Sequence, residues 1–224
     1  MGTSSHRVGF DALCHCASPH NFVPSGMSNM PLFPLSVFPM PGEMIGLHVF
    51  EPRFQAMFDE LEHNQLEEFG IPYTDASSMY RVGSVMRLIT VKSKNPDGSR
   101  DVVVAATSLF RLEELIPGEA PTGYPQGNVH RVEDWGSWEL GDACTKALHA
   151  LILDMKKQGL NTRHMENQGL VRVVQHLGIT ALQKAEILAQ STLHDMQSML
   201  LDSLEMTRMI VNQQSRDEDG VYLN

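Results

Sequence analysis

The periodicity of the apolar residues changes near Trp138, and this change limits the chain to a fold with two different halves. Before it, short runs rich in Val, Ile and Leu are separated by Pro, Gly and Asn, as is typical of strands joined by tight turns. After it, apolar residues recur every three or four positions, as they do on one face of a helix. The sequence therefore predicts an α+β protein in which a β-rich part precedes a helical bundle.

The β-rich part contains one strong hairpin signal. Asn95-Pro96-Asp97-Gly98 supplies turn chemistry between two runs of β-branched and apolar residues. Strands are expected at 81–92, 101–106, 110–116 and 126–132, with shorter ones after Met30. A short helix is expected as well, because Phe54, Met57, Phe58 and Leu61 follow helical spacing.

Four helices are expected after Trp138, each with its own start or stop signal. The first carries an apolar stripe from Leu140 to Met155 and ends at Gly159, and the second closes at Gly178. Thr180 and Gln183 have capping-box spacing before the third helix, and Thr192 with Asp195 repeats that spacing before the fourth. The fourth should fade in the polar stretch 212–219.

These patterns divide the chain into four parts. We expect a disordered leader over 1–29, a β subdomain over 30–134, a helical subdomain over 135–212 and a flexible tail over 213–224. No low-complexity linker separates the two subdomains, so they should pack closely.

Composition disfavours several classes of function. The 27 acidic and 17 basic residues give a net charge of −10, which opposes binding to a phosphate backbone. No run of about 18 apolar residues exists to span a membrane. The three cysteines, Cys14, Cys16 and Cys144, cannot form a disulfide framework, which fits a cytoplasmic protein.

The segment from Pro31 to Phe58 resembles the start of the N-terminal substrate-binding domain of Lon proteases. The family's Pro-Leu-Phe-Pro-Leu opening, Phe-Pro-x-Gly-like turn and Leu-His-Ile-Phe-Glu-Pro-Arg-Tyr run correspond to Pro31–Leu35, Phe38–Gly42 and Leu47–Phe54. Further similarities are FGIP at Phe69–Pro72, the hairpin turn and the segment from Leu177 to Leu204. The resemblance covers roughly Met30 to Val211.

The resemblance implies a fold and a function. The fold would be a β-rich pseudobarrel related to PUA domains, followed by about four helices. The function would be recognition of unfolded or apolar polypeptide segments, with the chain acting as an adaptor or regulator of a protease complex. Phe50, Glu51 and Arg53, in the best-matched motif, are the predicted peptide-binding residues, and no cofactor, metal or catalytic residue is expected. The chain contains no Gly-x-x-x-x-Gly-Lys-[Ser/Thr] loop and no Lon protease domain, so no enzymatic activity is expected.

One departure from the family concerns an arginine. The family often shows Gly-x-x-Arg-Phe-x-Ile where this chain has Leu109 in place of the arginine, within the segment Ala106–Leu112. If that arginine binds or orients something in the family, this protein does so otherwise or not at all.

Alternative interpretations remain open. An RNA-binding PUA-like module is suggested by the fold analogy alone, and a small hydrolase would use His48 and Glu51 as an acid/base pair. Cys14-His15-Cys16 offers zinc ligands, but at a spacing unlike that of structural zinc sites. The methionines of the last helix, Met196, Met199, Met206 and Met209, would suit varied peptide contacts but also an ordinary core. Trp135 and Trp138 either line a groove between the subdomains or pack their interface.

Overall fold

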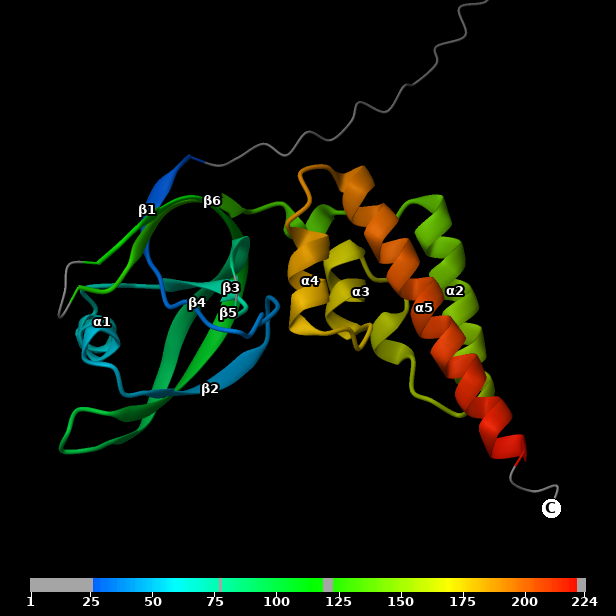
Figure 1. Ribbon diagram of the computed structural model, residues 1–224, viewed down its shortest axis with the longest axis horizontal. Helices are drawn as coiled ribbons and strands as arrows, with labels where there is room; N and C mark the ends of the chain where they lie inside the picture. The colour runs from blue at the N-terminus through cyan, green and yellow to red at the C-terminus, as the bar shows by residue number, and fades with distance from the viewer. Residues whose placement is uncertain (1–25, 77, 119–122, 221–224) are drawn as a thin grey trace, which may run out of the picture.

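Antiparallel strands make up the first half of the computed structural model, which describes residues 26–76, 78–118 and 123–220 (Figure 1). The strands are β1 (Ser28–Pro31), β2 (Met44–Val49), β3 (Phe69–Thr74), β4 (Met79–Lys94), β5 (Arg100–Ile116) and β6 (Gln126–Val132). Their order in the sheet is β1-β6-β5-β4-β3, and β2 pairs with the first part of β5. Parallel bridges from Leu32 to Gly70 and from Leu35 to Tyr73 bring the segment after β1 beside β3. The sheet therefore curls into a half-barrel.

The strand β5 is continuous, whereas the sequence predicted two separate strands at 101–106 and 110–116. It is continuous because β4 pairs along most of its length, while β2 and β6 share its other edge: β2 pairs with residues 100–105 and β6 with residues 109–116. The segment Phe69–Thr74 was not predicted as a strand. Its Pro72 is tolerated because β3 lies at the end of the sheet order.

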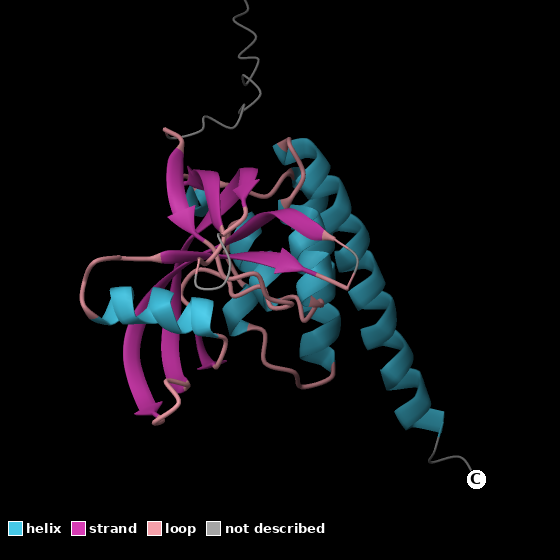
Figure 2. Ribbon diagram, turned by 60° about the vertical axis from the view of Figure 1, so that its left-hand side comes forward, coloured by secondary structure: helices cyan, strands magenta, loops and turns pink. Residues whose placement is uncertain are grey.

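The core of the half-barrel lies under helix α1 (Pro52–Glu62), which covers the lower strands (Figure 2). The predicted helical stripe is confirmed, since all four of its residues are buried: Phe54, Met57, Phe58 and Leu61. In the neighbouring part of the barrel, Phe110 of β5 pairs with Gly83 of β4, and its ring lies against that glycine. A Cβ on Gly83 would lie 2.5 Å from the Phe110 ring and 2.4 Å from the Ile71 carbonyl oxygen, so a larger residue does not fit there.

The second half is helical, as predicted. Its elements are η1 (Trp135–Ser137), α2 (Asp142–Lys157), η2 (Arg163–Met165), α3 (Leu170–His176), α4 (Ala181–Leu188) and α5 (Leu193–Gly220). Gly159 and Gly178 have positive φ values of 74° and 78°, as the predicted stops require. The Thr180–Gln183 capping box is present, and Thr192 accepts a bond from the Asp195 amide at 3.1 Å.

The end of the last helix was predicted wrongly. α5 does not fade in the stretch 212–219 but continues to Gly220. That stretch holds no Pro or Gly before Gly220, and its Gln, Arg and Glu residues favour helix, so polarity alone does not end it. Most of the predicted leader and the last four residues of the predicted tail lie outside the described residues; Ser28 and Asn29 belong to β1.

One hydrophobic cluster spans both halves. Side chains from the barrel, including Phe38, Tyr73 and Val132, pack in the same cluster as the buried residues of α2 to α5. Polar contacts reinforce this interface: Arg172 of α3 donates to the Pro41 carbonyl oxygen at 2.9 Å. The prediction of close packing between the β and α parts is thus consistent with the structure. Among the described residues, no helix has the length and apolar character needed to cross a membrane.

Candidate functional site

Of the three predicted peptide-binding residues, Glu51 and Arg53 pair with each other and Phe50 is exposed. Glu51 precedes α1 and forms an ion pair with Arg53 at 2.8 Å, and the Arg53 guanidinium lies 4.6 Å from the ring centroid of Phe54. Phe50 is 63% exposed, and its backbone is held by a 2.8 Å bond from Gln55. The structure therefore places Phe50 on the surface, where a ligand could contact it, and ties Glu51 and Arg53 to each other.

The proposed acid/base pair of His48 and Glu51 is not brought together. The His48 imidazole bonds Asp101 at 2.8 Å, and Ser93 donates to the other oxygen of Asp101 at 2.7 Å. These two hydrogen bonds lower the pKa of the Asp101 carboxyl. Because the carboxylate stands between the hydroxyl and the imidazole, His48 cannot activate Ser93 as it would in a hydrolase triad.

A second set of residues surrounds a cavity at the junction of the two halves, which we call the junction cleft. It has a volume of about 500 Å³, within the range of ordinary ligand sites. It is lined by Asp134, Ser137, Trp138, Glu139, Leu140, Gly141, Ser191, Leu193, Met196 and Gln197. The lining comes from two segments that are about fifty residues apart in the chain: the connection from β6 to α2 and the start of α5.

The first wall of the junction cleft is held by backbone contacts. The short helix η1 begins after Asp134, whose carbonyl accepts a 2.8 Å bond from the Ser137 hydroxyl. The Leu170 amide donates to the Trp138 carbonyl at 2.8 Å, and a Cβ on Gly169 would lie 2.8 Å from that same oxygen. The missing side chain of Gly169 thus lets the start of α3 approach the Trp138 backbone, and the Leu170 amide then holds that backbone in place.

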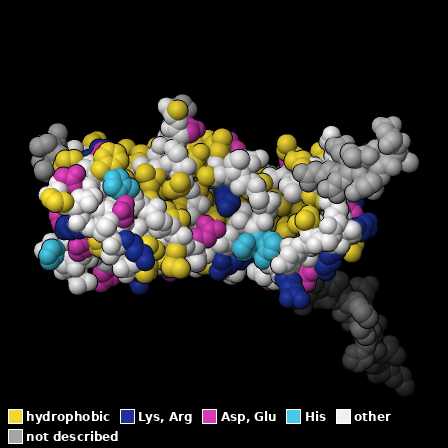
Figure 3. All heavy atoms as spheres, turned by 90° about the horizontal axis from the view of Figure 1, so that it is seen from below, with side chains coloured by type: hydrophobic (Ala, Val, Ile, Leu, Met, Phe, Trp, Pro, Cys, Tyr) yellow, Lys and Arg dark blue, Asp and Glu magenta, His cyan; other side chains and the backbone are white. Residues whose placement is uncertain are grey.

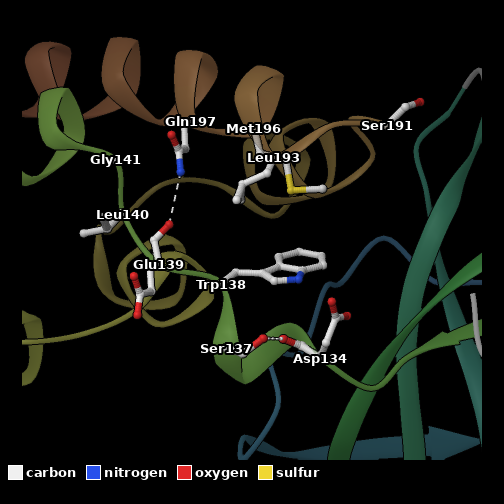
Figure 4. A pocket seen from close by; sticks show the side chains of 10 residues that line it. All are labelled: Asp134, Ser137, Trp138, Glu139, Leu140, Gly141, Ser191, Leu193, Met196 and Gln197. Atoms are coloured by element: carbon white, nitrogen blue, oxygen red, sulfur yellow. Dashed lines mark hydrogen bonds between the residues drawn. The ribbon is translucent and has the colours of Figure 1, made fainter. Parts of the chain in front are cut away.

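The second wall is tied to the first by a side chain of α5. Gln197 donates to the Glu139 carbonyl oxygen at 3.1 Å, which closes one end of the cleft (Figure 4). The indole of Trp138 extends between Met196 and Leu193 on one side and Asp134 on the other (Figure 4). The cleft therefore offers an aromatic face and two flexible or branched apolar side chains, bordered by a carboxylate.

The two tryptophans have different roles. Trp135 lies against Arg172, whose guanidinium carbon is 5.4 Å from the ring centroid, and both help to join the halves. Trp138 lines the junction cleft. The groove interpretation fits Trp138, and the packing interpretation fits Trp135.

The methionines of α5 also divide into two groups. Met196 is buried at the cleft and Met199 is half-buried, whereas Met206 and Met209 are 54% and 66% exposed on the outer part of the helix. Exposed apolar side chains occur on the barrel too, among them Met44 and Phe50. Figure 3 shows that hydrophobic side chains gather over parts of the lower face of the molecule, with charged side chains scattered between them.

Leu109 stands where the family pattern has an arginine, and it is a core residue. Leu109 is 1% exposed. Two positions later, Arg111 reaches α4 and donates to the carbonyl oxygens of Leu188, Ala189 and Gln190, at 3.3 Å and 3.0 Å for the first two. Sequence reasoning missed this contact, although the neighbouring position had drawn attention. Arg111 fixes the turn between α4 and α5 that carries Ser191 to the cleft.

No group of three or more potential metal ligands occurs among the residues that the structure describes. Cys14, His15 and Cys16, which were considered as zinc ligands, lie outside those residues. The buried Cys144 donates to the Gln197 carbonyl at 3.1 Å, and burial raises the pKa of its thiol.

A half-barrel and a helical bundle thus meet at a cavity with both apolar and polar lining residues. The profile of the ATP-dependent protease La (LON) substrate-binding domain matches residues 29–208, so the chain belongs to that family. A search of curated proteins finds no match.

Two solved structures share the fold. A Lon N-terminal domain protein from Xanthomonas campestris has a TM-score of 0.59 at 21% identity and covers 78% of this chain and 98% of its own. The N-terminal domain of a Mycobacterium avium complex Lon protease has a TM-score of 0.57 at 13% identity and covers 80% and 98%, respectively. At these identities the two structures establish the architecture and leave the ligand to be argued from the site.

Proposed function

We propose that this protein is a non-catalytic module that binds exposed apolar segments of unfolded polypeptides in the junction cleft. The observation that supports this function is the cleft's lining of Trp138, Leu193 and Met196 in a cavity of about 500 Å³. Large aromatic side chains carry much of the energy of protein interfaces, and a methionine side chain adapts to varied partners. Family membership supplies the class of ligand, a polypeptide substrate.

Two further parts of the proposal rest on family membership and composition. The chain acts as an adaptor or regulator that brings such polypeptides to a protease, and it works in the cytoplasm. Adding the purified chain to an extract of the source cells should change the rate at which a labelled unfolded client is degraded. An unchanged rate, with client binding intact, would contradict the adaptor role and leave the binding function in place.

The binding function is tested by fluorescence anisotropy of labelled unfolded peptides titrated with the whole chain. We expect saturable binding, and we expect Trp138→Ala to weaken it by about tenfold or more, since removing a central interface tryptophan often costs about 2 kcal/mol. The control is Leu153→Ala, which removes an apolar side chain that is 60% exposed and lies outside the cleft lining. Absence of binding to any unfolded peptide would refute the function, and equal affinity of the Trp138 variant would refute the site.

The same titration with a labelled RNA oligomer tests the alternative. The net charge of −10 predicts no binding even at low ionic strength, where phosphate contacts are strongest. A salt-dependent RNA shift would favour the RNA-binding interpretation over the peptide-binding one.

A further inference from the structure

The lining of the junction cleft carries two carboxylates and no basic side chain. Asp134 and Glu139 line the cleft, and no Lys, Arg or His is among the ten lining residues. Across the described part of the chain, no ion pair involves either carboxylate, whereas Asp59, Glu62 and Asp154 are each paired with basic side chains. The cleft thus carries negative charge that the protein itself does not neutralise.

A basic side chain, that of Arg172, lies near the first wall of the cleft. Arg172 lies over Trp135, and its guanidinium already donates to the Pro41 carbonyl at 2.9 Å and to Gln175 at 2.7 Å. Asp142 and Asp195, which adjoin cleft residues in the chain, are both exposed. The whole chain carries a net charge of −10, so long-range attraction has the same sign as the local one.

An aromatic surface lies beside this negative charge. The indole of Trp138 extends toward Asp134, and Leu193 and Met196 form the opposite wall (Figure 4). A guanidinium stacks favourably on an indole face and can pair with a carboxylate at the same time. A large apolar side chain fits between the leucine and the methionine. The two kinds of surface adjoin, so a ligand that satisfies both carries a cation next to an apolar group.

We infer that the junction cleft selects segments of unfolded polypeptides in which an arginine adjoins a large apolar residue. The arginine lies over Trp138 with its charge toward Asp134, and the apolar residue packs on Leu193 and Met196. This inference rests on the proposed function, because it assigns a sequence preference to the same site. It excludes acidic segments, whose carboxylates would face Asp134.

The test compares three labelled peptides that are identical except at one position beside a leucine, which holds Arg, Gln or Glu. The Arg peptide should bind the whole chain about tenfold more tightly than the Gln peptide, from a cation–π contact and partly exposed ion pairs, and the Glu peptide should bind most weakly. The difference between Arg and Gln should shrink when the salt concentration rises from 50 to 500 mM. The Gln peptide should still bind through its apolar residue.

Charge-removing variants locate the preference. The double variant Asp134→Asn/Glu139→Gln should bind the Arg peptide as weakly as the Gln peptide and leave the affinity of the Gln peptide unchanged. The control double variant Glu67→Gln/Glu205→Gln removes the same number of charges from exposed positions outside the cleft and should keep the preference.

The outcomes separate this inference from the function on which it rests. Equal affinity of the Arg and Gln peptides, or loss of the preference in the control variant, would overturn the inference while binding of unfolded peptides stands. If none of the three peptides binds, the proposed function itself fails.

Discussion

Replacing Arg111 with methionine should destabilise the protein and loosen the turn that borders the junction cleft. The guanidinium comes from β5 and donates to three carbonyl oxygens at the end of α4, those of Leu188, Ala189 and Gln190. Carbonyls at the end of a helix have no partners within the helix, and the helix dipole makes that end negative. Burial lowers the pKa of the Arg111 guanidinium from its ordinary value, and an arginine side chain in a protein stays charged at neutral pH.

The magnitude follows from these contacts. A hydrogen bond that involves a charged group contributes about 1.5 kcal/mol or more, so two well-placed bonds, with the long 3.3 Å bond to Leu188 neglected, give about 3 kcal/mol. Arg111→Met keeps most of the apolar length and removes all the donors, so its free energy of unfolding should fall by about 3 kcal/mol. Arg111→Lys keeps the charge but presents it as a point, and should lose about half as much.

Urea denaturation measures both changes. The fluorescence of Trp135 and Trp138, which lie at the junction, reports unfolding of the interface, and linear extrapolation gives the free energies. A loss below about 0.5 kcal/mol in Arg111→Met, the range of ordinary surface substitutions, would refute the capping role. A lysine variant as unstable as the methionine variant would show that charge at this helix end contributes little.

Three further predictions test other parts of the structure. Gly83→Ala should lower the free energy of unfolding by about 3 kcal/mol, because the new Cβ has no room. Gly46→Ala should raise the free energy of unfolding by up to about 1 kcal/mol, because its Cβ meets only the Val102 carbonyl oxygen at 3.9 Å. Urea denaturation of both variants measures the contrast. Hydrogen bonds from Arg208, Lys157 and Asn212 hold the pKa of Asp154 below its ordinary 3.8, so the carboxylate stabilises the fold above about pH 4 and loses this effect as the pH falls through the lower folded value. Asp154→Asn should therefore be less stable at pH 7 and show a flatter decline of unfolding free energy in acid, and an unchanged acid slope would contradict this account. Phe50→Ser should leave stability within about 0.5 kcal/mol of the wild type, because the ring is 63% exposed; if it nevertheless weakens binding of unfolded peptides in the anisotropy titration, the predicted site at Phe50, Glu51 and Arg53 takes part in recognition.

The sequence predicted those features that depend on neighbouring residues. The capping box of Thr180 and Gln183 and the glycine stops at Gly159 and Gly178 are set by local backbone geometry, and all are present. The continuous strand β5 was missed because its unity comes from pairing with β4, which no local pattern records.

The candidate site was less accessible to sequence reasoning. Trp138 was recognised as a residue of the junction, but its neighbours Leu193 and Met196 come from a helix that begins more than fifty residues later. Only packing of the two halves brings them together. The Arg111 contact was missed for the same reason, because its partners are backbone carbonyls of a distant helix. Every residue has a backbone carbonyl, so no residue type in the sequence indicates such a partner.

Among the described strands, β2 pairs only with β5, and this pairing bears on how the protein behaves at high concentration. The Ala106 amide bonds the Glu43 carbonyl, so by the alternation of antiparallel strands Gly46 and His48 turn their backbone N–H and C=O groups away from β5. Such an edge invites a strand from a second molecule, and proteins discourage this with short edge strands and charged side chains. β2 has only six residues, and the polar pair of His48 and Asp101 lies at one end of it. Removing that pair should therefore make this edge more prone to pair with a strand of a second molecule.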